Sequence, residues 1–292
     1  MNGTIIKGVG GFYYVDTGGA VYECRARGRF RLDENSPMVG DHVEIQPEGG
    51  KLKGYVTEIF ERSSKMLRPP VANVDQFALV VAASAPRPDL LLCDKLLLQA
   101  ELQGVGSIII INKCDEAEDE LVGSIQEEYS RSGAKLIFVS ALKKEGISEL
   151  TDALKGRISC FAGQSAVGKS SIINAISPKI ELKTGGLSRK TDRGRHTTRH
   201  AELIAAAGGY VVDTPGFSLL ELSPMEPGEL CRCYPEMRPF LGLCRFPDCV
   251  HAAEPECAVK DAVAKGDVPK GRYARYLALL DELRELQKKR YD

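Results

Sequence analysis

Eight consecutive residues have the spacing of a loop that binds the phosphates of a nucleotide. Gly163 and Gly168, followed by Lys169 and Ser170, fit the pattern G-x-x-x-x-G-K-[ST] directly after the apolar run 158–162. In such a loop the backbone N–H groups turn toward the phosphates, the lysine reaches the outer phosphates and the serine hydroxyl is placed for Mg²⁺. The sequence therefore predicts a nucleotide site made of Gly163, Gln164, Ser165, Ala166, Val167, Gly168, Lys169, Ser170 and Ser171.

Two further strand ends indicate that the base is guanine. Residues 112–115 fit N-K-x-D at the end of an apolar run, and Ser140 and Ala141 follow the next run. A carboxylate at Asp115 can accept hydrogen bonds from the two adjacent N–H donors of guanine, whereas adenine presents an acceptor there. Alone, N-K-x-D also fits a helix start capped by Asp. With the phosphate loop it predicts base contacts from Asn112, Lys113, Cys114, Asp115, Ser140 and Ala141.

A third motif is typical of a loop that responds to the γ-phosphate. Asp213 and Gly216 fit D-x-x-G, so the aspartate is expected to hold Mg²⁺ through water and the Gly216 amide to contact the γ-phosphate. Thr197 or Thr198 would add a hydroxyl ligand to Mg²⁺, and the sequence does not choose between them.

Four residues near position 250 have the spacing of a metal site. The pattern Cys244-x4-Cys249-x-His251-x5-Cys257 offers three thiols and one imidazole, which suits a tetrahedral, structural Zn²⁺ with no open position. A chance cluster of cysteines is the alternative. Cys231 and Cys233 form a nearby C-x-C that could compete as ligands.

Composition excludes several classes of protein. The 292 residues carry a formal net charge of −1, which excludes a uniformly basic coat for nucleic acid but not a local basic patch. No apolar run approaches the roughly 20 residues of a membrane helix, and residues 1–10 contain no secretory signal. Nine cysteines, several of them in apolar runs, favour reduced thiols. We expect a cytoplasmic protein.

The first 68 residues predict a small β-barrel. Short strand-like runs at 11–16, 21–26, 29–32, 41–45 and 54–60 alternate with turn signals, and five short strands favour an OB-fold. Arginines at 25, 27, 29 and 31 alternate, so one strand face could bind RNA phosphates beside aromatic side chains. An ordinary solvated strand face is the alternative.

The middle and the end of the chain have different patterns. Strands at 77–83, 107–111, 135–139, 158–162, 201–206 and 210–213, with helices at 89–102, 117–131, 147–154 and 170–176, predict a mainly parallel sheet covered on both faces. After residue 224 a stretch rich in Cys and Pro leads to an amphipathic helix at 270–291. The predicted domains are 1–68, 69–224 and 225–292.

The motifs occur in the order base, base, phosphate, switch, switch, which is a circular permutation of the usual order. In all three predicted domains the chain resembles the ribosome small-subunit-dependent circularly permuted GTPases (RsgA, also called YjeQ). The resemblance implies an OB-fold barrel, a permuted P-loop GTPase domain and an α-rich zinc domain with Cys244, Cys249, His251 and Cys257 as ligands. It also implies GTP/GDP with Mg²⁺, one structural Zn²⁺, and a protein that acts late in maturation of the 30S subunit, binds 16S rRNA and is released on hydrolysis. We expect a monomer, although the sequence does not decide the oligomeric state.

Catalysis is expected to depend on that partner. The residue after D-x-x-G is Phe217, which cannot orient water, so slow intrinsic hydrolysis is predicted. His196 is the best internal candidate to orient or deprotonate water, and the resemblance points to it too. Contact of His196 with RNA or solvent alone is the alternative. The predicted catalytic set is His196, Lys169, Thr197 and Thr198.

Residues 183–200 hold six basic residues against one acid, which favours binding to rRNA phosphates. Two rival functions remain at this stage. One is a metallochaperone gated by GTP, against which a closed four-ligand site argues. The other is a GTP-binding RNA scaffold without catalysis, against which the intact Lys169, Ser170, Asp115 and Asp213 argue.

Overall fold

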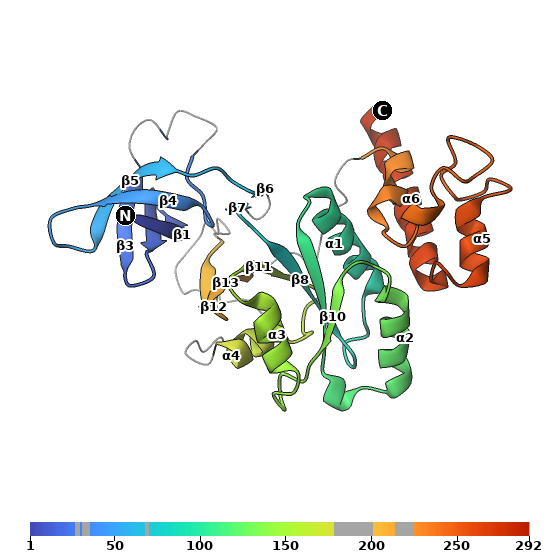
Figure 1. Cartoon of the computed structure of the whole chain (residues 1–292), viewed down its shortest axis with the longest axis horizontal. Coiled ribbons are helices and arrows are strands. Elements are labelled where there is room, and N and C mark those ends of the chain that lie inside the picture. The colour runs from blue at the N-terminus through green and yellow to red at the C-terminus, as the bar shows by residue number, and fades with distance from the viewer. Residues whose placement is uncertain (27–29, 31–35, 68–69, 178–200, 214–224, 292) are drawn as a thin grey trace.

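The computed structural model describes residues 1–26, 30, 36–67, 70–177, 201–213 and 225–291 (Figure 1). A barrel lies at the N-terminal end, a sheet with helices lies in the middle, and a helical region with the C-terminus lies at the far end. Several sequence predictions fall outside the described residues: the strand at 29–32 apart from residue 30, the arginines at 27, 29 and 31, the basic stretch 183–200, and Phe217.

The N-terminal barrel is closed by strands in the order β1-β2-β3-β5-β4. They are β1 (Asn2–Val9), β2 (Phe12–Asp16), β3 (Val21–Ala26), β4 (His42–Pro47) and β5 (Lys53–Ile59). Alternate residues point inward, so that Ile5, Val15, Cys24, Val43, Ile45 and Val56 form its core. The predicted five-stranded barrel is therefore confirmed. Its first strand, β1, is one that the sequence prediction did not include.

The central sheet has six strands in the order β10-β9-β8-β11-β13-β12. They are β8 (Gln76–Ala82), β9 (Gly106–Asn112), β10 (Lys135–Phe138), β11 (Ile158–Ala162), β12 (Leu203–Ala206) and β13 (Gly209–Asp213). All neighbouring pairs are parallel except the β12–β13 hairpin, as the mainly parallel prediction requires. A small hairpin, β6 (Lys65–Leu67) and β7 (Pro70–Ala72), precedes the sheet.

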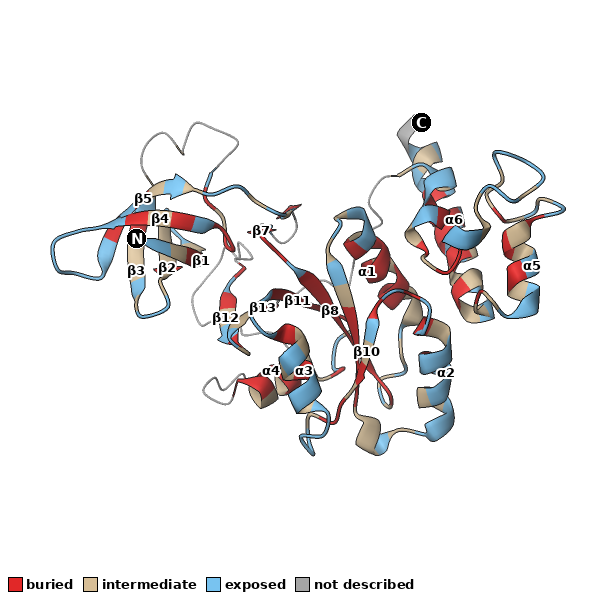
Figure 2. Ribbon diagram, viewed as in Figure 1, coloured by how far each residue is buried: buried red, intermediate tan, exposed pale blue. Residues whose placement is uncertain are grey.

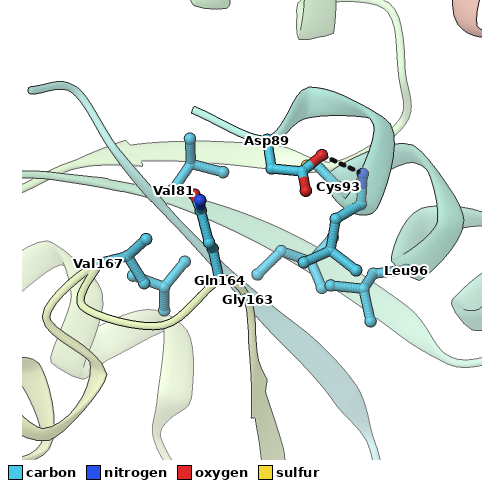
Figure 3. Close-up of a pocket in the computed structure, with 10 residues that line it drawn as sticks. Val81, Asp89, Cys93, Leu96, Gly163, Gln164 and Val167 are labelled. Carbon is cyan, nitrogen blue, oxygen red and sulfur yellow. Dashed lines mark hydrogen bonds between the residues drawn. The ribbon is translucent and has the colours of Figure 1, made fainter. Parts of the chain in front are cut away.

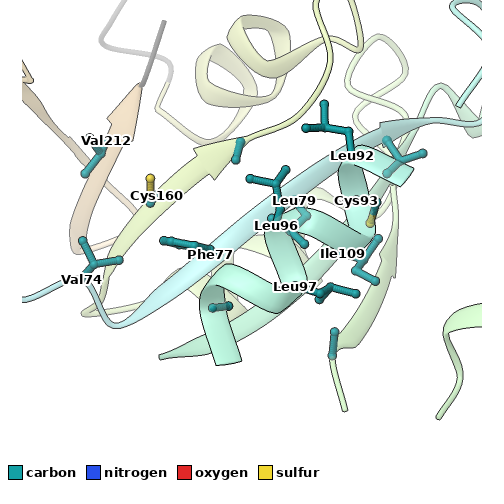
Figure 4. Close-up of a cluster of buried hydrophobic side chains, with 14 of the residues drawn as sticks. Val74, Phe77, Leu79, Leu92, Cys93, Leu96, Leu97, Ile109, Cys160 and Val212 are labelled. Atoms are coloured by element: carbon teal, nitrogen blue, oxygen red, sulfur yellow. The ribbon is translucent and has the colours of Figure 1, made fainter. Parts of the chain in front are cut away.

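Helices cover both faces of this sheet, because its central strands are apolar on both sides. Every residue of β8 is buried, as Figure 2 shows along the middle of the sheet. On one face α1 (Leu90–Leu102) and α2 (Asp119–Tyr129) contribute to a core with Phe77, Leu96 and Ile109 (Figure 4). On the other face α3 (Ile147–Leu154) and α4 (Lys169–Ile176) form a second core.

The C-terminal region, residues 225–291, is helical. It consists of two short 3-10 helices, η4 (Pro227–Cys233) and η5 (Arg238–Phe240), then α5 (Ala258–Lys265) and α6 (Lys270–Tyr291). The predicted amphipathic helix coincides with α6, and its residues Tyr276, Leu280 and Leu283 lie in a core that also includes Leu98 of α1. No helix in the described part of the chain is long and apolar enough to cross a membrane.

Candidate nucleotide site and metal centre

The predicted phosphate and base motifs meet at one edge of the sheet. The phosphate loop follows β11, residues 112–115 follow β9, and Ser140 follows β10. The carboxyl ends of parallel strands share one edge, where open α/β sheets bind their ligands. The structure therefore brings together motifs that lie up to about 50 residues apart in the chain.

Glycines at both ends of the phosphate loop are required by close backbone approaches. Gly163 has φ +140° and Gly168 has φ +95°, and both values disfavour residues with a side chain. A Cβ atom at Gly163 would lie 2.2 Å from the Val80 carbonyl oxygen, and one at Gly168 would lie 2.3 Å from Asn112 Nδ2. Gly168 then caps α4, whose first turn carries Lys169, Ser170 and Ser171.

The side chain of Lys169 lies along its own loop. Its Nζ donates to the carbonyl oxygens of Gly163 and Gln164, both at 2.8 Å. Ser165 and Ala166, at the turn of the loop, are exposed, and Ala166 has φ +63°. The loop thus holds an ammonium group and exposed backbone at the start of a helix, the combination that stabilises phosphate groups.

Asn112 joins the phosphate loop to the base loop. Its Nδ2 donates to the Val167 carbonyl oxygen at 2.9 Å, and its Oδ1 accepts from the Ala141 amide at 3.2 Å. The side chain is 2% exposed, so both amide groups are satisfied inside the protein. Asn112 therefore positions two loops, and the structure places its polar atoms on the protein rather than toward solvent.

Asp115 is prepared to accept hydrogen bonds. A hydrogen bond from the Ser140 hydroxyl, above all, keeps the pKa of the Asp115 carboxyl below its ordinary value. Ser140 Oγ in turn accepts from the Lys143 amide at 3.0 Å, which fixes the turn after β10. An ionised carboxylate at this edge is an acceptor for adjacent N–H donors such as those of guanine.

The two residues between Asn112 and Asp115 shape the same loop. Lys113 has a left-handed backbone conformation, with φ +65°, and its Nζ donates to the Ala85 carbonyl oxygen. Cys114 begins a single 3-10 turn, and its thiol contacts the Ile111 carbonyl oxygen at 3.2 Å. Lys113 therefore bridges the base loop to the loop that follows β8.

A small pocket lies between the phosphate loop and the start of α1 (Figure 3). Asp89 caps α1 by accepting from the Leu92 amide at 2.9 Å, and Gln164 reaches in from the loop. Gln164 Oε1 is buried with no hydrogen-bond partner among the described residues. The sequence placed Gln164 in the phosphate loop but gave no signal that it lines a pocket shared with α1.

The switch residues are only partly described. Asp213 is the last residue of β13, and its backbone pairs with Phe161 of β11, the strand that leads into the phosphate loop. His196, Thr197, Thr198 and Gly216 lie outside the described residues. Their roles remain predictions.

The four predicted metal ligands form one cluster. Cys244 Sγ lies 3.8 Å from Cys257 Sγ, and His251 Nδ1 lies 3.5, 3.5 and 3.4 Å from the sulfur atoms of Cys244, Cys249 and Cys257. Around a tetrahedral zinc, sulfur atoms lie about 3.8 Å apart and sulfur and nitrogen about 3.5 Å apart, given bonds of about 2.3 and 2.0 Å. The donor atoms therefore fit a zinc ion. Burial lowers the pKa of His251, which favours the neutral imidazole that a metal needs.

Neither residue of the C-x-C belongs to this cluster in the described chain. Only Cys244, Cys249, His251 and Cys257 bring their donor atoms within 4.8 Å of one another, and the Cys231 thiol contacts the Gly228 carbonyl oxygen at 3.4 Å. Two supporting groups were missed at the level of sequence. Tyr273 and Tyr276 of α6 donate from their hydroxyls to the carbonyl oxygens of His251 and Val250, both at 2.7 Å. Their helical spacing had indicated core packing alone.

Comparisons with known proteins agree with this geometry. The profile of the family described as RsgA GTPase matches residues 59–223, and that of the RsgA N-terminal domain matches residues 2–56. A protein of Halalkalibacterium halodurans named small ribosomal subunit biogenesis GTPase RsgA is 42% identical, with 99% of each chain covered. A relative of the same name from Caldanaerobacter subterraneus is 46% identical and covers 100% of this chain and 98% of its own.

Two solved structures are similar throughout. One is the crystal structure of YloQ, a circularly permuted GTPase, with a TM-score of 0.80, 38% identity, and 97% of this chain and 95% of that one covered. The other is YjeQ from Thermotoga maritima, with a TM-score of 0.83, 36% identity, and 97% and 98% covered.

Proposed function

The chain belongs to the RsgA family of circularly permuted GTPases, and on that premise we propose that it hydrolyses GTP during biogenesis of the small ribosomal subunit. The observation that carries the proposal is the pair of hydrogen bonds from Asn112, which hold the phosphate loop and the base loop together at one edge of the sheet. The names of the full-length relatives support the ribosomal role.

We propose that the phosphate loop and the N-K-x-D loop bind GTP and GDP. Gly163 to Ser171 would surround the phosphates, and Asp115, with Lys113 and Ser140, would recognise guanine. The low pKa of Asp115 supports this role, because recognition needs the ionised acceptor. Ser170, the Asp213 carboxylate through water, and Thr197 or Thr198 would hold Mg²⁺, and Gly216 would contact the γ-phosphate.

We propose His196 as the group that orients water, in a segment ordered by the ribosomal subunit. Phe217 in place of a glutamine supports slow hydrolysis by the free protein. The Cys244, Cys249, His251 and Cys257 cluster would hold one structural zinc ion, which its four closely spaced donors support.

The barrel is proposed to bind 16S rRNA. Arg25 lies 4.8 Å from the centre of the Phe12 ring and is the register partner of the exposed Tyr55 across β3 and β5. A guanidinium group beside aromatic rings on one face can pair with phosphates and stack on unpaired bases. We further propose a monomer that acts in the cytoplasm, with domains 1–68, 69–224 and 225–292 and with release from the 30S subunit on hydrolysis.

The proposal is tested by GTP turnover alone and with purified 30S, 50S and 70S particles. Of the three particles, we expect only the 30S subunit to raise the rate of the protein, by about tenfold or more. A tenfold rise is equivalent to about 1.4 kcal/mol of transition-state stabilisation. Equal rates with all particles would contradict activation by the small subunit. That result would leave the metal-transfer function, which a zinc-release assay on GTP addition would test.

The role of His196 has its own test. A His196→Ala variant should bind GTP normally and lose about 100-fold of the stimulated rate, the usual contribution of a general base. His42→Ala is a matched control, because His42 is an exposed residue of β4 that contacts Thr4 of the neighbouring strand β1 at 3.1 Å. Full stimulation of His196→Ala would overturn the assignment.

A further inference from the structure

Two sets of contacts attach the barrel to the central domain. One is the chain segment that leads into the sheet, where Val39 pairs with Val71 and Asn73 Nδ2 donates to the Gly40 carbonyl oxygen. The other is the β12–β13 hairpin. The Tyr210 hydroxyl of β13 donates to Asp16 Oδ2 of β2 at 2.9 Å. Lys7 of β1 forms an ion pair with Glu202 at 3.1 Å, and the same two residues form an isolated antiparallel bridge. In Figure 1 the hairpin lies between the barrel and the rest of the sheet.

A bulge in β1 is part of this attachment. Ile5 pairs with Val15 and Lys7 pairs with Tyr14, so Ile6 is an extra residue in β1. Ile5 points into the barrel core, whereas Ile6 packs against the core of the central sheet, which includes Leu203 and Val212. Because of the bulge, adjacent residues of β1 pack into two different cores, Ile5 into that of the barrel and Ile6 against that of the central sheet.

The hairpin is a short, regular element whose two strands are held in one register. Its strands join through Ala207 and Gly208, both with positive φ (+53° and +70°), the conformation of a tight two-residue turn whose register is fixed. Its outer ends continue directly into the two chain segments that carry the predicted Mg²⁺ and γ-phosphate contacts, Thr197 or Thr198 before β12 and Gly216 after β13. Among the described elements, the hairpin is therefore the one that lies in the chain between the two predicted switch segments and that also contacts the barrel.

We propose that Ile6, Lys7 and Asp16 of the barrel couple to Glu202 and Tyr210, so that the nucleotide state is relayed to the barrel through the β12–β13 hairpin. The inference rests on GTP binding as proposed above and adds how that site is regulated. Coupling is reciprocal: a ligand that shifts the barrel must change the preference for GTP over GDP by the same factor. RNA bound to the barrel would thus tune the nucleotide site without touching it.

Hydrogen exchange of the full-length protein tests this without ribosomes. The protein is compared with GDP–Mg²⁺ and with a non-hydrolysable GTP analogue and Mg²⁺. We expect amides of residues 4–9 and 12–16 to exchange at rates that differ about fivefold between the two states, the low end of typical coupling. Amides of β5, which pairs with β3 and β4 and not with β1 or β2, serve as the internal reference.

Two variants locate the path. In Tyr210→Phe, which loses only a hydroxyl, and in Ile6→Ala combined with it, the difference should fall below about twofold while both nucleotides still bind. Tyr14→Phe is the matched control, because its hydroxyl faces Glu23 within the barrel at 3.5 Å. It should keep the full difference.

The outcomes separate the two proposals. Equal exchange in the two nucleotide states of the natural protein, or a difference that both variants retain, overturns this inference and leaves the proposed function intact. A chain that binds neither nucleotide overturns both proposals. Coupling that is present in a protein unresponsive to 30S subunits supports this inference and contradicts activation by the subunit.

Discussion

The ion pair that joins the barrel to the β12–β13 hairpin and the ion pairs that join the C-terminal region to α1 differ in burial. Arg272 of α6 and Asp94 of α1 meet at 2.6 Å with side chains only 2% and 0% exposed. The Lys7–Glu202 pair at the barrel has side chains 39% and 54% exposed. An exposed pair contributes little to stability, whereas a buried network is costly to break.

The buried network fixes α6 to two helices. Asp94 accepts from both Arg272 and Arg275 and from the Tyr129 hydroxyl at 2.7 Å, and Arg275 also pairs with Glu128 of α2 at 2.6 Å. Arg272 also forms an ion pair with Glu236, at 2.6 Å. Because a buried charge without a partner is costly, the network holds α6 in the one position that keeps these charges paired.

The C-terminal region follows the switch segment in the chain, but its buried contacts are with α1 and α2. Residues 214–224 lead from β13 into the C-terminal region, so the order of the chain by itself favours movement of that region on loss of the γ-phosphate. Its buried attachment to α1 and α2 instead predicts that it moves with those helices. The barrel contacts the hairpin between the two switch segments through exposed and half-buried groups, and it is the part that we expect to respond.

The largest effect is expected on removal of a zinc ligand, which also tests whether the attachment of α6 depends on zinc. Cys249→Ser removes one of four donors, so bound zinc should fall from about one per chain to below about 0.2, and the loop 244–257 should lose more than about 5 kcal/mol of local stability. The α6 network should survive, because its arginines face α1 rather than the cluster. Zinc content by mass spectrometry and exchange in α6 check both points.

Unchanged zinc in Cys249→Ser would place the site elsewhere. Cys233→Ser is the matched control, because Cys233 lies outside the ligand cluster in the described chain. It should keep its zinc.

The next effect tests the buried network itself. Asp94→Ala leaves Arg272 and Arg275 without their shared carboxylate inside the protein, which should cost about 3–5 kcal/mol of unfolding free energy. Asp281→Ala, which removes the exposed partner of Arg284, should cost less than about 0.5 kcal/mol. Urea unfolding gives both values. A cost below about 1 kcal/mol for Asp94→Ala would erase the contrast between the two attachments.

Sequence patterns predicted the site better than the attachments. Glycines, Lys169 and Asp115 occur at strand ends because their chemistry is local, so their spacing could be recognised. Asp94 and Arg272 are 178 residues apart, and nothing in a helix marks one arginine as buried. Strand β1 was missed because Ile5 and Ile6 are adjacent, and the bulge that sends them to two cores interrupts the alternation of a regular strand.

A smaller effect is expected at the bulge. Ile6→Ala removes packing between β1 and the central core, and because Ile6 is only partly buried we expect a loss of about 1–2 kcal/mol, less than for a core isoleucine. Ile5→Ala, inside the barrel, should cost about 2–5 kcal/mol. Thermal unfolding gives both. An Ile6→Ala protein as stable as the natural one would show that the bulge carries no docking energy.

The smallest effect is the dependence of the hairpin contact on pH. Burial, followed by the hydrogen bond to Asp16, raises the pKa of Tyr210 from 10.0 to about 12. A raised pKa means that the neutral hydroxyl is favoured in the folded state, so its contribution is complete below pH 10 and is lost as the pH rises toward 12.

Because Tyr210 is partly exposed and water screens the pair, we expect that contribution to be only about 1 kcal/mol. The stability difference between the natural protein and Tyr210→Phe should therefore shrink between pH 9 and pH 12, whereas the difference for Tyr14→Phe, measured by the same urea titrations, serves as the baseline. A Tyr210→Phe difference that stays constant over this range would mean that the hydroxyl does not hold the barrel. Among the described residues, Ile6 and Lys7 would then be the ones that join the barrel to the hairpin, and the difference between these contacts and the buried α6 network would be larger.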